Sequence, residues 1–116
     1  MTLDEFREAF ERFRAAATAD AIAAREPMRA SAELTALYQK FDSEERALAQ
    51  TVLSEWADSD DAGVRWSARD LIRAFRVVTA IESLRRSAAR LSGSRDAPAR
   101  YEVLAIQRLL KELGAD

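Results

Sequence analysis

Cysteine and histidine are both missing from this chain of 116 residues. The absence of cysteine excludes disulfides, thiolate nucleophiles and thiolate-bound zinc, and it is compatible with a reducing compartment. The absence of histidine removes the commonest general base near neutral pH and the commonest neutral metal ligand. Any catalysis would therefore depend on carboxylates, lysine, tyrosine or serine. We expect a protein that is not an enzyme and that uses no metal ion or cofactor.

Long apolar runs are missing as well. The N-terminus reads MTLDEFREAF, which is charged and amphipathic, and no later stretch is apolar enough for a signal peptide or a membrane span. A chain of this length can bury about two-thirds of its unfolded surface in one core without disulfides. The sequence therefore predicts a single domain, residues 1–116, in a soluble cytoplasmic protein without membrane attachment.

Lysine is scarce, because 16 of the 18 basic residues are arginine. The charge is divided unevenly along the chain. Residues 1–62 carry 7 basic and 14 acidic side chains, whereas residues 63–116 carry 11 basic and 6 acidic ones, so a net charge of −2 conceals segments of −7 and +5. Two interpretations stay open: the molecule is a dipole, or the two segments neutralise each other across helix contacts.

Strand signals are missing, since the chain has no alternating β-branched run and no Asn-Gly or Asp-Gly turn. Apolar residues instead recur every three or four positions in six segments, which predicts six helices. Thr2 and Glu5 have the spacing of a capping box, and Asp42 or Ser43 can cap the third helix. The residues expected to face inward are Leu3, Phe6, Phe10 and Phe13; Leu34, Leu37, Tyr38 and Phe41; Leu48, Val52, Leu53 and Trp56. In the last three helices they are Val64, Ala68, Leu71, Ile72 and Phe75; Ile81, Leu84, Ala88 and Leu91; Tyr101, Leu104, Ala105, Leu109 and Leu113.

The segment DSDDAGVRWSAR, residues 58–69, partly matches a calcium-binding EF-hand loop. Such a loop needs oxygen ligands at its first, third and fifth positions and a glutamate at its twelfth. Here the fifth position is Ala62 and the twelfth is Arg69, so one ligand is lost and another has the wrong charge. Helix capping explains the segment better, with Ser59 or Asp60 accepting hydrogen bonds from amides of the next helical turn.

Residues 59–91 have the pattern of two helices joined by a short link. The residues of this pattern are the turn residue Asp61, the pair Val64 and Arg65, the small Ala68, the apolar Leu71 and Ile72, and Ala80, Ile81 and Leu84 in the second helix. This pattern resembles a HEAT-type helical repeat. A weaker match to its first helix follows about 35 residues later, a spacing typical of helical repeats, at Asp96, Pro98, Tyr101, Ala105 and Leu109.

The resemblance implies an all-α fold: a short right-handed superhelix of about three HEAT-like hairpins, made from six helices. A globular bundle with one HEAT-like hairpin is the alternative. HEAT-type proteins are mostly scaffolds and adaptors, and small bacterial chains similar to this one include immunity proteins that neutralise toxins. The resemblance therefore implies a protein-binding module, and in its most specific form an immunity- or antitoxin-like inhibitor of a bacterial toxin.

An arginine row marks one face of the helix that begins near Val64. At about 100° per residue, Arg65, Arg69, Arg73 and Arg76 fall within about 80° of one another, and Trp66 lies beside Arg73. Tryptophan next to arginine is typical of binding hot spots. In the alternative interpretation, Arg65 is structural and bonds an acid or a carbonyl of the preceding turn, and Trp66 is packed. The residues predicted to bind a partner are Trp66, Arg69, Arg73 and Arg76.

A second candidate surface is acidic and would suit a basic toxin such as a nuclease. It comprises Glu55, Asp58, Asp60 and Asp61. The alternative function is nucleic-acid binding through the arginine-rich segment. The overall charge of −2 and the scarcity of lysine favour a protein partner. The sequence leaves open the oligomeric state and whether the first helix caps the fold or pairs with another subunit. The arginines proposed for nucleic-acid binding are Arg69, Arg73, Arg76, Arg85, Arg86 and Arg90.

Overall fold

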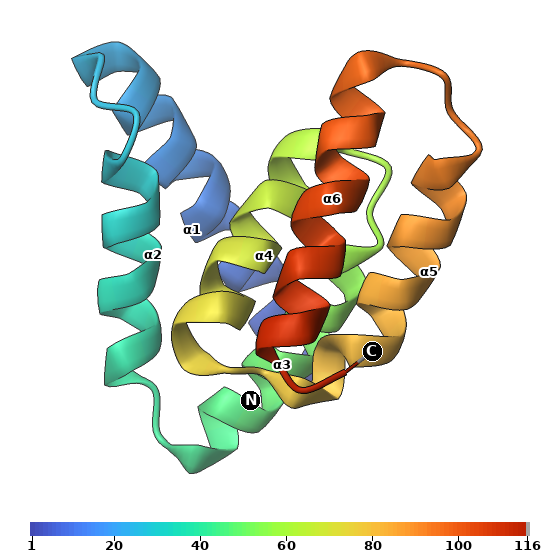
Figure 1. The fold of residues 1–116 in the computed structure, drawn as a ribbon. Coiled ribbons are helices and arrows are strands. Elements are labelled where there is room, and N and C mark those ends of the chain that lie inside the picture. Colours follow the sequence, from blue (N-terminus) through green and yellow to red (C-terminus); the bar gives the residue numbers. More distant parts are fainter. Residues whose placement is uncertain (116) are drawn as a thin grey trace. The chain divides into compact units, whose positions relative to one another are not determined.

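A computed structural model of the chain describes residues 1–115, which form six α-helices and no strand (Figure 1). The expected all-α class with six helices is confirmed. A short 3₁₀ turn, Val78–Ala80, precedes the fifth helix. The helices are α1 (Leu3–Ala24), α2 (Arg29–Lys40), α3 (Ser43–Ala57), α4 (Ala62–Phe75), α5 (Ile81–Ser92) and α6 (Ala97–Glu112).

Two of the helices begin with reciprocal capping boxes, each of which satisfies amides that have no partner within the helix. At α1, Thr2 Oγ1 accepts from the Glu5 amide at 3.1 Å and Glu5 Oε1 accepts from the Thr2 amide at 3.0 Å. The hydrogen bond from the Thr2 amide to the Glu5 carboxylate, supported by the Thr2 side chain, holds the pKa of Glu5 below its usual value. At α3, Asp42 Oδ1 accepts from the Glu45 amide at 2.8 Å. Both predicted caps are confirmed, with Asp42 rather than Ser43 in the second.

The chain divides into two compact units, and the boundary falls inside α3, between Val52 and Leu53. The N-terminal unit contains α1, α2 and the first part of α3. The C-terminal unit contains the end of α3 followed by α4, α5 and α6. The single domain expected from the chain length stays a prediction.

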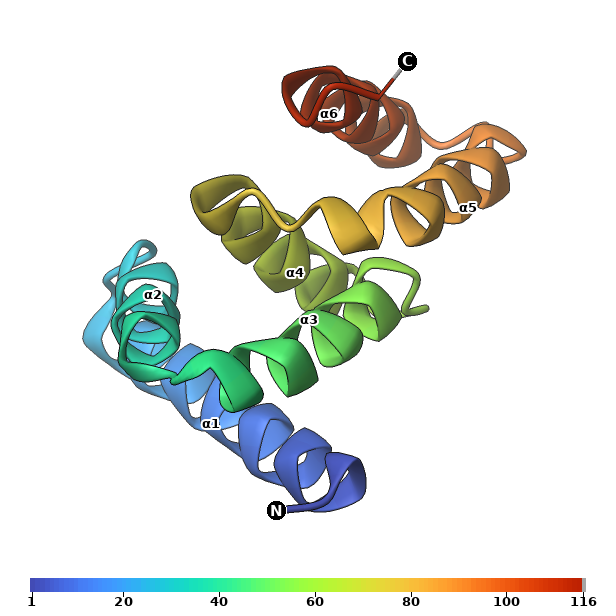
Figure 2. The same ribbon diagram turned by 90° about the horizontal axis from the view of Figure 1, so that it is seen from below.

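An aromatic cluster forms the core of the N-terminal unit, where α1 and α2 lie side by side (Figures 1 and 2). The rings of Phe6 and Phe10 lie edge to face, with their centroids 5.6 Å apart. Phe41 contacts both, at 5.3 Å and 5.7 Å. Such edge-to-face pairs add stabilisation beyond the area that they bury. Phe6 and Phe10 are buried as expected, whereas Phe13 lies at the edge of this cluster.

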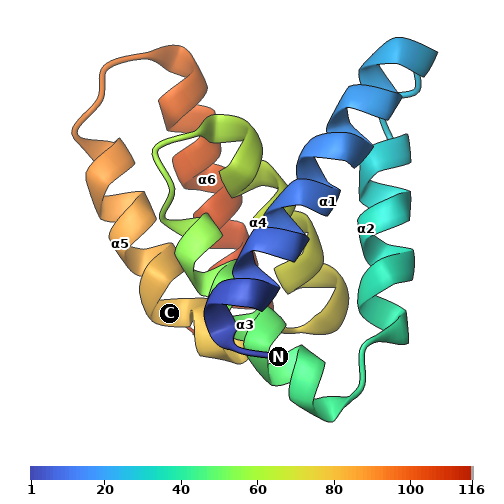
Figure 3. The same ribbon diagram turned by 180° about the vertical axis from the view of Figure 1, so that it is seen from behind.

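In the C-terminal unit, α5 and α6 form a helical hairpin joined by residues 93–96 (Figure 3), and α4 contacts α6. α4 buries its apolar side as the spacing predicts. Ala68, Leu71 and Ile72 are fully buried, as are Leu84 of α5 and Leu109 of α6.

The rotation of α6 about its own axis differs from the prediction. Tyr101 and Leu104 were expected to face inward, but they are 73% and 57% exposed, whereas Ile106 and Leu110 are buried. The periodicity was ambiguous because apolar residues occur around most of this helix. A polar contact decides the orientation, because Glu102 of α6 faces α4.

Candidate functional site

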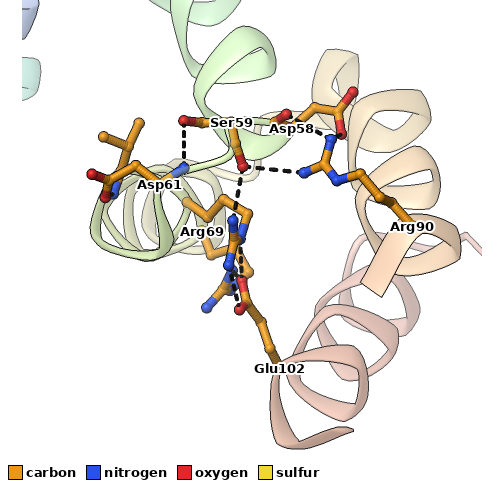
Figure 4. Close-up of polar contacts among 8 residues, drawn as sticks. Asp58, Ser59, Asp61, Arg69, Arg90 and Glu102 are labelled. Atoms are coloured by element: carbon orange, nitrogen blue, oxygen red, sulfur yellow. Dashed lines mark hydrogen bonds and ion pairs between the residues drawn. The ribbon is translucent and has the colours of Figure 1, made fainter. Parts of the chain in front are cut away.

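The turn between α3 and α4 is a helix cap built from side chains of the segment 58–61 (Figure 4). Asp61 has an extended backbone, and its Oδ1 accepts from the Val64 amide at 3.0 Å. Ser59 Oγ in turn accepts from the Asp61 amide at 3.1 Å. The predicted capping role of this segment is confirmed, but Ser59 and Asp60 were the wrong choice of capping residue. Asp61 fits because it directly precedes the helix, where a carboxylate reaches the first-turn amides.

Arg65, in the first turn of α4, connects this cap to α6. Its Nη1 donates to the carbonyl oxygen of Ser59 at 2.9 Å. Its Nε and Nη2 donate to the two carboxylate oxygens of Glu102, at 2.6 Å and 2.9 Å. A bidentate pair of this kind fixes both distance and orientation. The interpretation that Arg65 bonds a carbonyl of the preceding turn is therefore confirmed.

Arg69 joins the same carboxylate one turn later, with Nη1 2.6 Å from Glu102 Oε2 (Figure 4). The three side chains form an Arg–Glu–Arg cluster (Arg65, Arg69 and Glu102), and they are only 8%, 12% and 13% exposed. The hydrogen bond from Arg65, supported by Arg69 and opposed by burial, holds the pKa of Glu102 below its usual value. The hydrogen bond to Glu102 likewise raises the pKa of Arg65.

The remaining two arginines of the row also reach α6, at its other end. Arg73 Nε lies 3.2 Å from Glu112 Oε2, in an ion pair that is about half exposed. Arg76 Nη1 donates to the backbone carbonyl of Glu112 at 3.1 Å. The arginine row thus lies along the contact between α4 and α6 instead of standing free of the rest of the unit.

The acidic candidate surface is partly engaged in structural contacts. Asp58 pairs with Arg90 at 2.7 Å and with Arg86 at 3.5 Å, both from α5. Arg90 also donates to the Asp58 and Ser59 carbonyl oxygens, each at 3.1 Å. It therefore satisfies backbone acceptors just after the C-terminal end of α3. Asp61 is the cap of α4. The other two members, Glu55 and Asp60, are exposed.

A hollow of about 400 Å³ lies between α4 and α6 of the C-terminal unit. Its two large aromatic side chains are Trp66, which is 46% exposed, and Tyr101, which is 73% exposed. The interpretation of Trp66 as a packed residue therefore holds for only about half of its surface. We refer to this hollow as the α4–α6 groove. It is lined by Ala62, Trp66, Arg69, Asp70, Arg73, Pro98, Tyr101, Glu102 and Ala105.

The structure thus brings together three of the four residues predicted to bind a partner, namely Trp66, Arg69 and Arg73, and adds Tyr101. Sequence reasoning missed Tyr101 because it assigned this residue to the core. A signal was available: arginines that repeat every four positions along α4 require acceptors, and α6 offers Glu102 and Glu112 as its only carboxylates. Turning Glu102 toward α4 leaves the neighbouring Tyr101 at the surface.

Within residues 1–115, no group of three or more acidic side chains is arranged to hold a metal ion. None of the helices in this part of the chain is long and apolar enough to cross a membrane. Comparisons with protein-family models, with curated proteins and with solved structures find no match to this chain. We therefore infer function from the chemistry of the groove.

Proposed function

We propose that this chain is a non-enzymatic protein-binding module, and that the α4–α6 groove is its binding surface. One observation carries the proposal: Trp66 and Tyr101 expose large aromatic area at the same hollow, next to the half-exposed Arg73. Tryptophan, tyrosine and arginine are the residues that dominate measured binding hot spots. Their rings offer apolar area and a polar edge at a small cost in side-chain entropy.

The Arg–Glu–Arg cluster supports this proposal by holding the groove in shape. Arg69 and Glu102 line the hollow and are tied to each other, and Arg65 ties them both to the turn before α4. A partner would therefore meet walls that are already ordered, which lowers the entropic cost of association. In this account Arg69 positions the wall, while Trp66, Tyr101 and Arg73 contact the partner.

A protein partner fits these contacts better than a nucleic acid does. Affinity for nucleic acid comes mainly from arginine and lysine side chains that neutralise phosphates. The six arginines assigned to that alternative instead bond carboxylate or carbonyl oxygens of the C-terminal unit. They are Arg69, Arg73, Arg76, Arg85, Arg86 and Arg90.

More specific roles stay predictions. The HEAT-like superhelix, the cytoplasmic location and the immunity- or antitoxin-like inhibition of a toxin rest on the sequence and on the resemblance drawn from it. The proposal of a protein-binding groove does not depend on them, because it follows from exposed side chains of α4 and α6.

Affinity capture with the tagged full chain tests the proposal. Nuclease-treated lysate of the source cells is passed over the wild-type protein, the Trp66→Ala/Tyr101→Ala variant and an Ile22→Ala/Met28→Ala control. The control residues are also large, apolar and exposed, but they belong to the N-terminal unit. We expect the wild type and the control to retain the same protein, and the groove variant to retain it at least about tenfold less well.

Equal retention by all three proteins would contradict the assignment of the groove. Loss of every retained protein after nuclease treatment would instead support the nucleic-acid alternative. Circular dichroism and thermal melting of each variant confirm that the comparison is between folded proteins.

A further inference from the structure

The free positive charge of the C-terminal unit is concentrated at its last helix. The arginines of α4 and α5 are bonded to carboxylates or carbonyls, as described above. By contrast, four cationic side chains between residues 95 and 111 make no hydrogen bond or ion pair with any residue of the described range 1–115. They are Arg95, Arg100, Arg108 and Lys111.

Three of these cations lie on one face of α6. Arg100, Arg108 and Lys111 are separated by eight and three positions, which places them within about 80° of one another around the helix. Leu104 lies between them on the same face and is 57% exposed. We call Arg95, Arg100, Leu104, Arg108 and Lys111 the α6 basic face. It combines an apolar anchor point with cations that have no internal partner.

A second hollow of about 520 Å³ opens at the N-terminal end of this face. Arg95 and Arg100 line it together with apolar side chains from the end of α5 and from α6. Cations at a hollow that is partly lined by apolar side chains match a ligand that carries both negative charge and an apolar group. The residues that line the hollow are Leu91, Ser92, Gly93, Ser94, Arg95, Arg100, Val103 and Leu104.

We propose that the α6 basic face is a second docking surface, which binds an acidic, amphipathic protein segment. An apolar side chain of that segment occupies the hollow against Leu104, and its carboxylates pair with Arg100 and Arg108. None of the five residues of this face belongs to the lining of the α4–α6 groove. The proposal therefore stands independently of the proposed function.

Apolar walls favour a protein segment over a nucleic acid as the occupant. If a nucleic-acid backbone followed this face, its strongly hydrated phosphates would lie against Leu91, Val103 and Leu104. The apolar surface of these residues would then stay in contact with water, and binding would gain no hydrophobic free energy from it. A leucine-sized side chain of a protein partner would remove that apolar surface from water. Its flanking carboxylates would meanwhile meet guanidinium groups that have no other partner.

Fluorescence anisotropy with a defined probe tests this surface. The probe is a labelled alanine-based helical peptide of about 16 residues, with glutamate at spacings of four and leucine in alternate turns. Two control probes replace every glutamate with glutamine, or every leucine with serine. The full chain is compared with its Arg100→Glu/Arg108→Glu and Leu104→Ser variants. The charge-matched control is Arg12→Glu/Arg85→Glu, which alters arginines on α1 and α5.

We expect the wild type to bind the acidic leucine peptide at least about tenfold more tightly than either control peptide. Arg100→Glu/Arg108→Glu should lose at least about tenfold in affinity, and the charge-matched control should stay within about twofold of wild type. Leu104→Ser should weaken binding of the leucine peptide but leave binding of the serine peptide unchanged. This single substitution keeps the test decisive if the charge reversal unfolds the protein. Trp66→Ala, on α4, should bind the probe like wild type, which separates this surface from the groove.

Three results would overturn the proposal. The first is that the wild type does not bind the acidic leucine peptide. The second is an equal loss of affinity in the charge-matched control, because the attraction would then be general. The third is that a single-stranded oligothymidylate of the same charge binds more tightly and displaces the peptide, which would make nucleic acid the occupant.

Discussion

Glu102 is the single carboxylate between two arginine side chains that are almost fully covered. Removing one member of a buried ion cluster costs far more than the net value of the intact cluster, because the remaining charge is left in a poorly solvated position. Glu102 accepts three hydrogen bonds, two from Arg65 and one from Arg69, and both arginines belong to α4. At the residue scale, this carboxylate therefore determines the spacing and rotation of the two walls of the groove.

Substitution Glu102→Gln should destabilise the protein by about 2–3 kcal/mol at pH 7, because the amide has no negative charge and places a donor NH2 group where the second carboxylate oxygen accepts from a guanidinium group. The effect should depend on pH. In the unfolded chain Glu102 titrates near its ordinary value of 4.5, and in the folded chain its pKa is lower. The stabilisation is therefore complete above that value and is lost as the pH falls through the folded-state pKa. Urea unfolding of both proteins between pH 7 and pH 3 should show the difference shrinking on acidification.

Glu112→Gln is the matched control for this prediction. The ion pair of Glu112 with Arg73 joins the same two helices, α6 and α4, but both of its side chains are about half exposed. Exposed ion pairs contribute about 0–1 kcal/mol, so this variant should unfold nearly like wild type. A loss in Glu112→Gln as large as that in Glu102→Gln, or a loss in Glu102→Gln that does not change with pH, would contradict the role given to the cluster.

At the scale of the elements, α4 and α6 end in different ways. α6 ends at Glu112, and the chain then turns at Gly114, whose φ of 85° is a conformation that glycine adopts without strain. α4 ends at Phe75 and is capped by Arg76, which has a left-handed backbone with φ of 51° and ψ of 57° although it carries a side chain. The amide of Val77 donates to the Ile72 carbonyl at 3.0 Å and closes the helix. The Arg76 side chain offsets part of the strain by donating to the last carbonyl of α6.

At Arg76, a glycine variant should therefore be more stable than an alanine variant, which is the reverse of the usual order of stability in a helix. In a regular helix, alanine is more stable than glycine by about 1 kcal/mol. At this left-handed position we expect Arg76→Gly to be more stable than Arg76→Ala by about 1 kcal/mol, because both variants lose the Arg76 hydrogen bond but only glycine relieves the backbone strain. Urea denaturation of the two variants measures the difference. Equal stability, or a more stable alanine variant, would show that no strain is stored at this helix end.

Across the whole chain, basic and acidic side chains are more nearly balanced within each structural unit than within residues 1–62 or residues 63–116. The N-terminal unit, residues 1–52, has 7 basic and 10 acidic side chains, whereas residues 53–116 have 11 and 10. The units are therefore −3 and +1, much closer to neutral than the −7 and +5 of the sequence halves. This difference comes from four acidic residues that belong to the C-terminal unit, Glu55, Asp58, Asp60 and Asp61. One of them, Asp58, pairs with Arg86 and Arg90 of the same unit. The interpretation that acidic and basic segments neutralise each other across helix contacts is confirmed for these pairs.

The sequence was sufficient to predict the six helices, the capping box of α1, a cap at the start of α3 and the buried side of α4, because these features depend on local spacing. It was insufficient for the rotation of α6, because apolar residues surround that helix and several rotations would bury similar area. The contact that selects one rotation joins Glu102 to residues 33 and 37 positions away. Pairing over such a separation leaves no periodic signal. The exposure of Tyr101, and with it the aromatic groove, follows from this contact.

The proposed function requires that a partner protein covers Trp66 in the α4–α6 groove. The chain has two tryptophans, and Trp56 is 6% exposed, so a Trp56→Phe variant would leave Trp66 as the sole tryptophan fluorophore. The decisive measurement follows the fluorescence of Trp66 in this variant during titration with the protein retained in the capture experiment. Both the emission wavelength and the quenching of the fluorescence by acrylamide are recorded. Burial of the indole should shift the emission to shorter wavelength and reduce quenching about in proportion to the fraction bound. Saturable binding with unchanged emission and unchanged quenching would contradict the claim, because the partner would then occupy a surface that does not include Trp66.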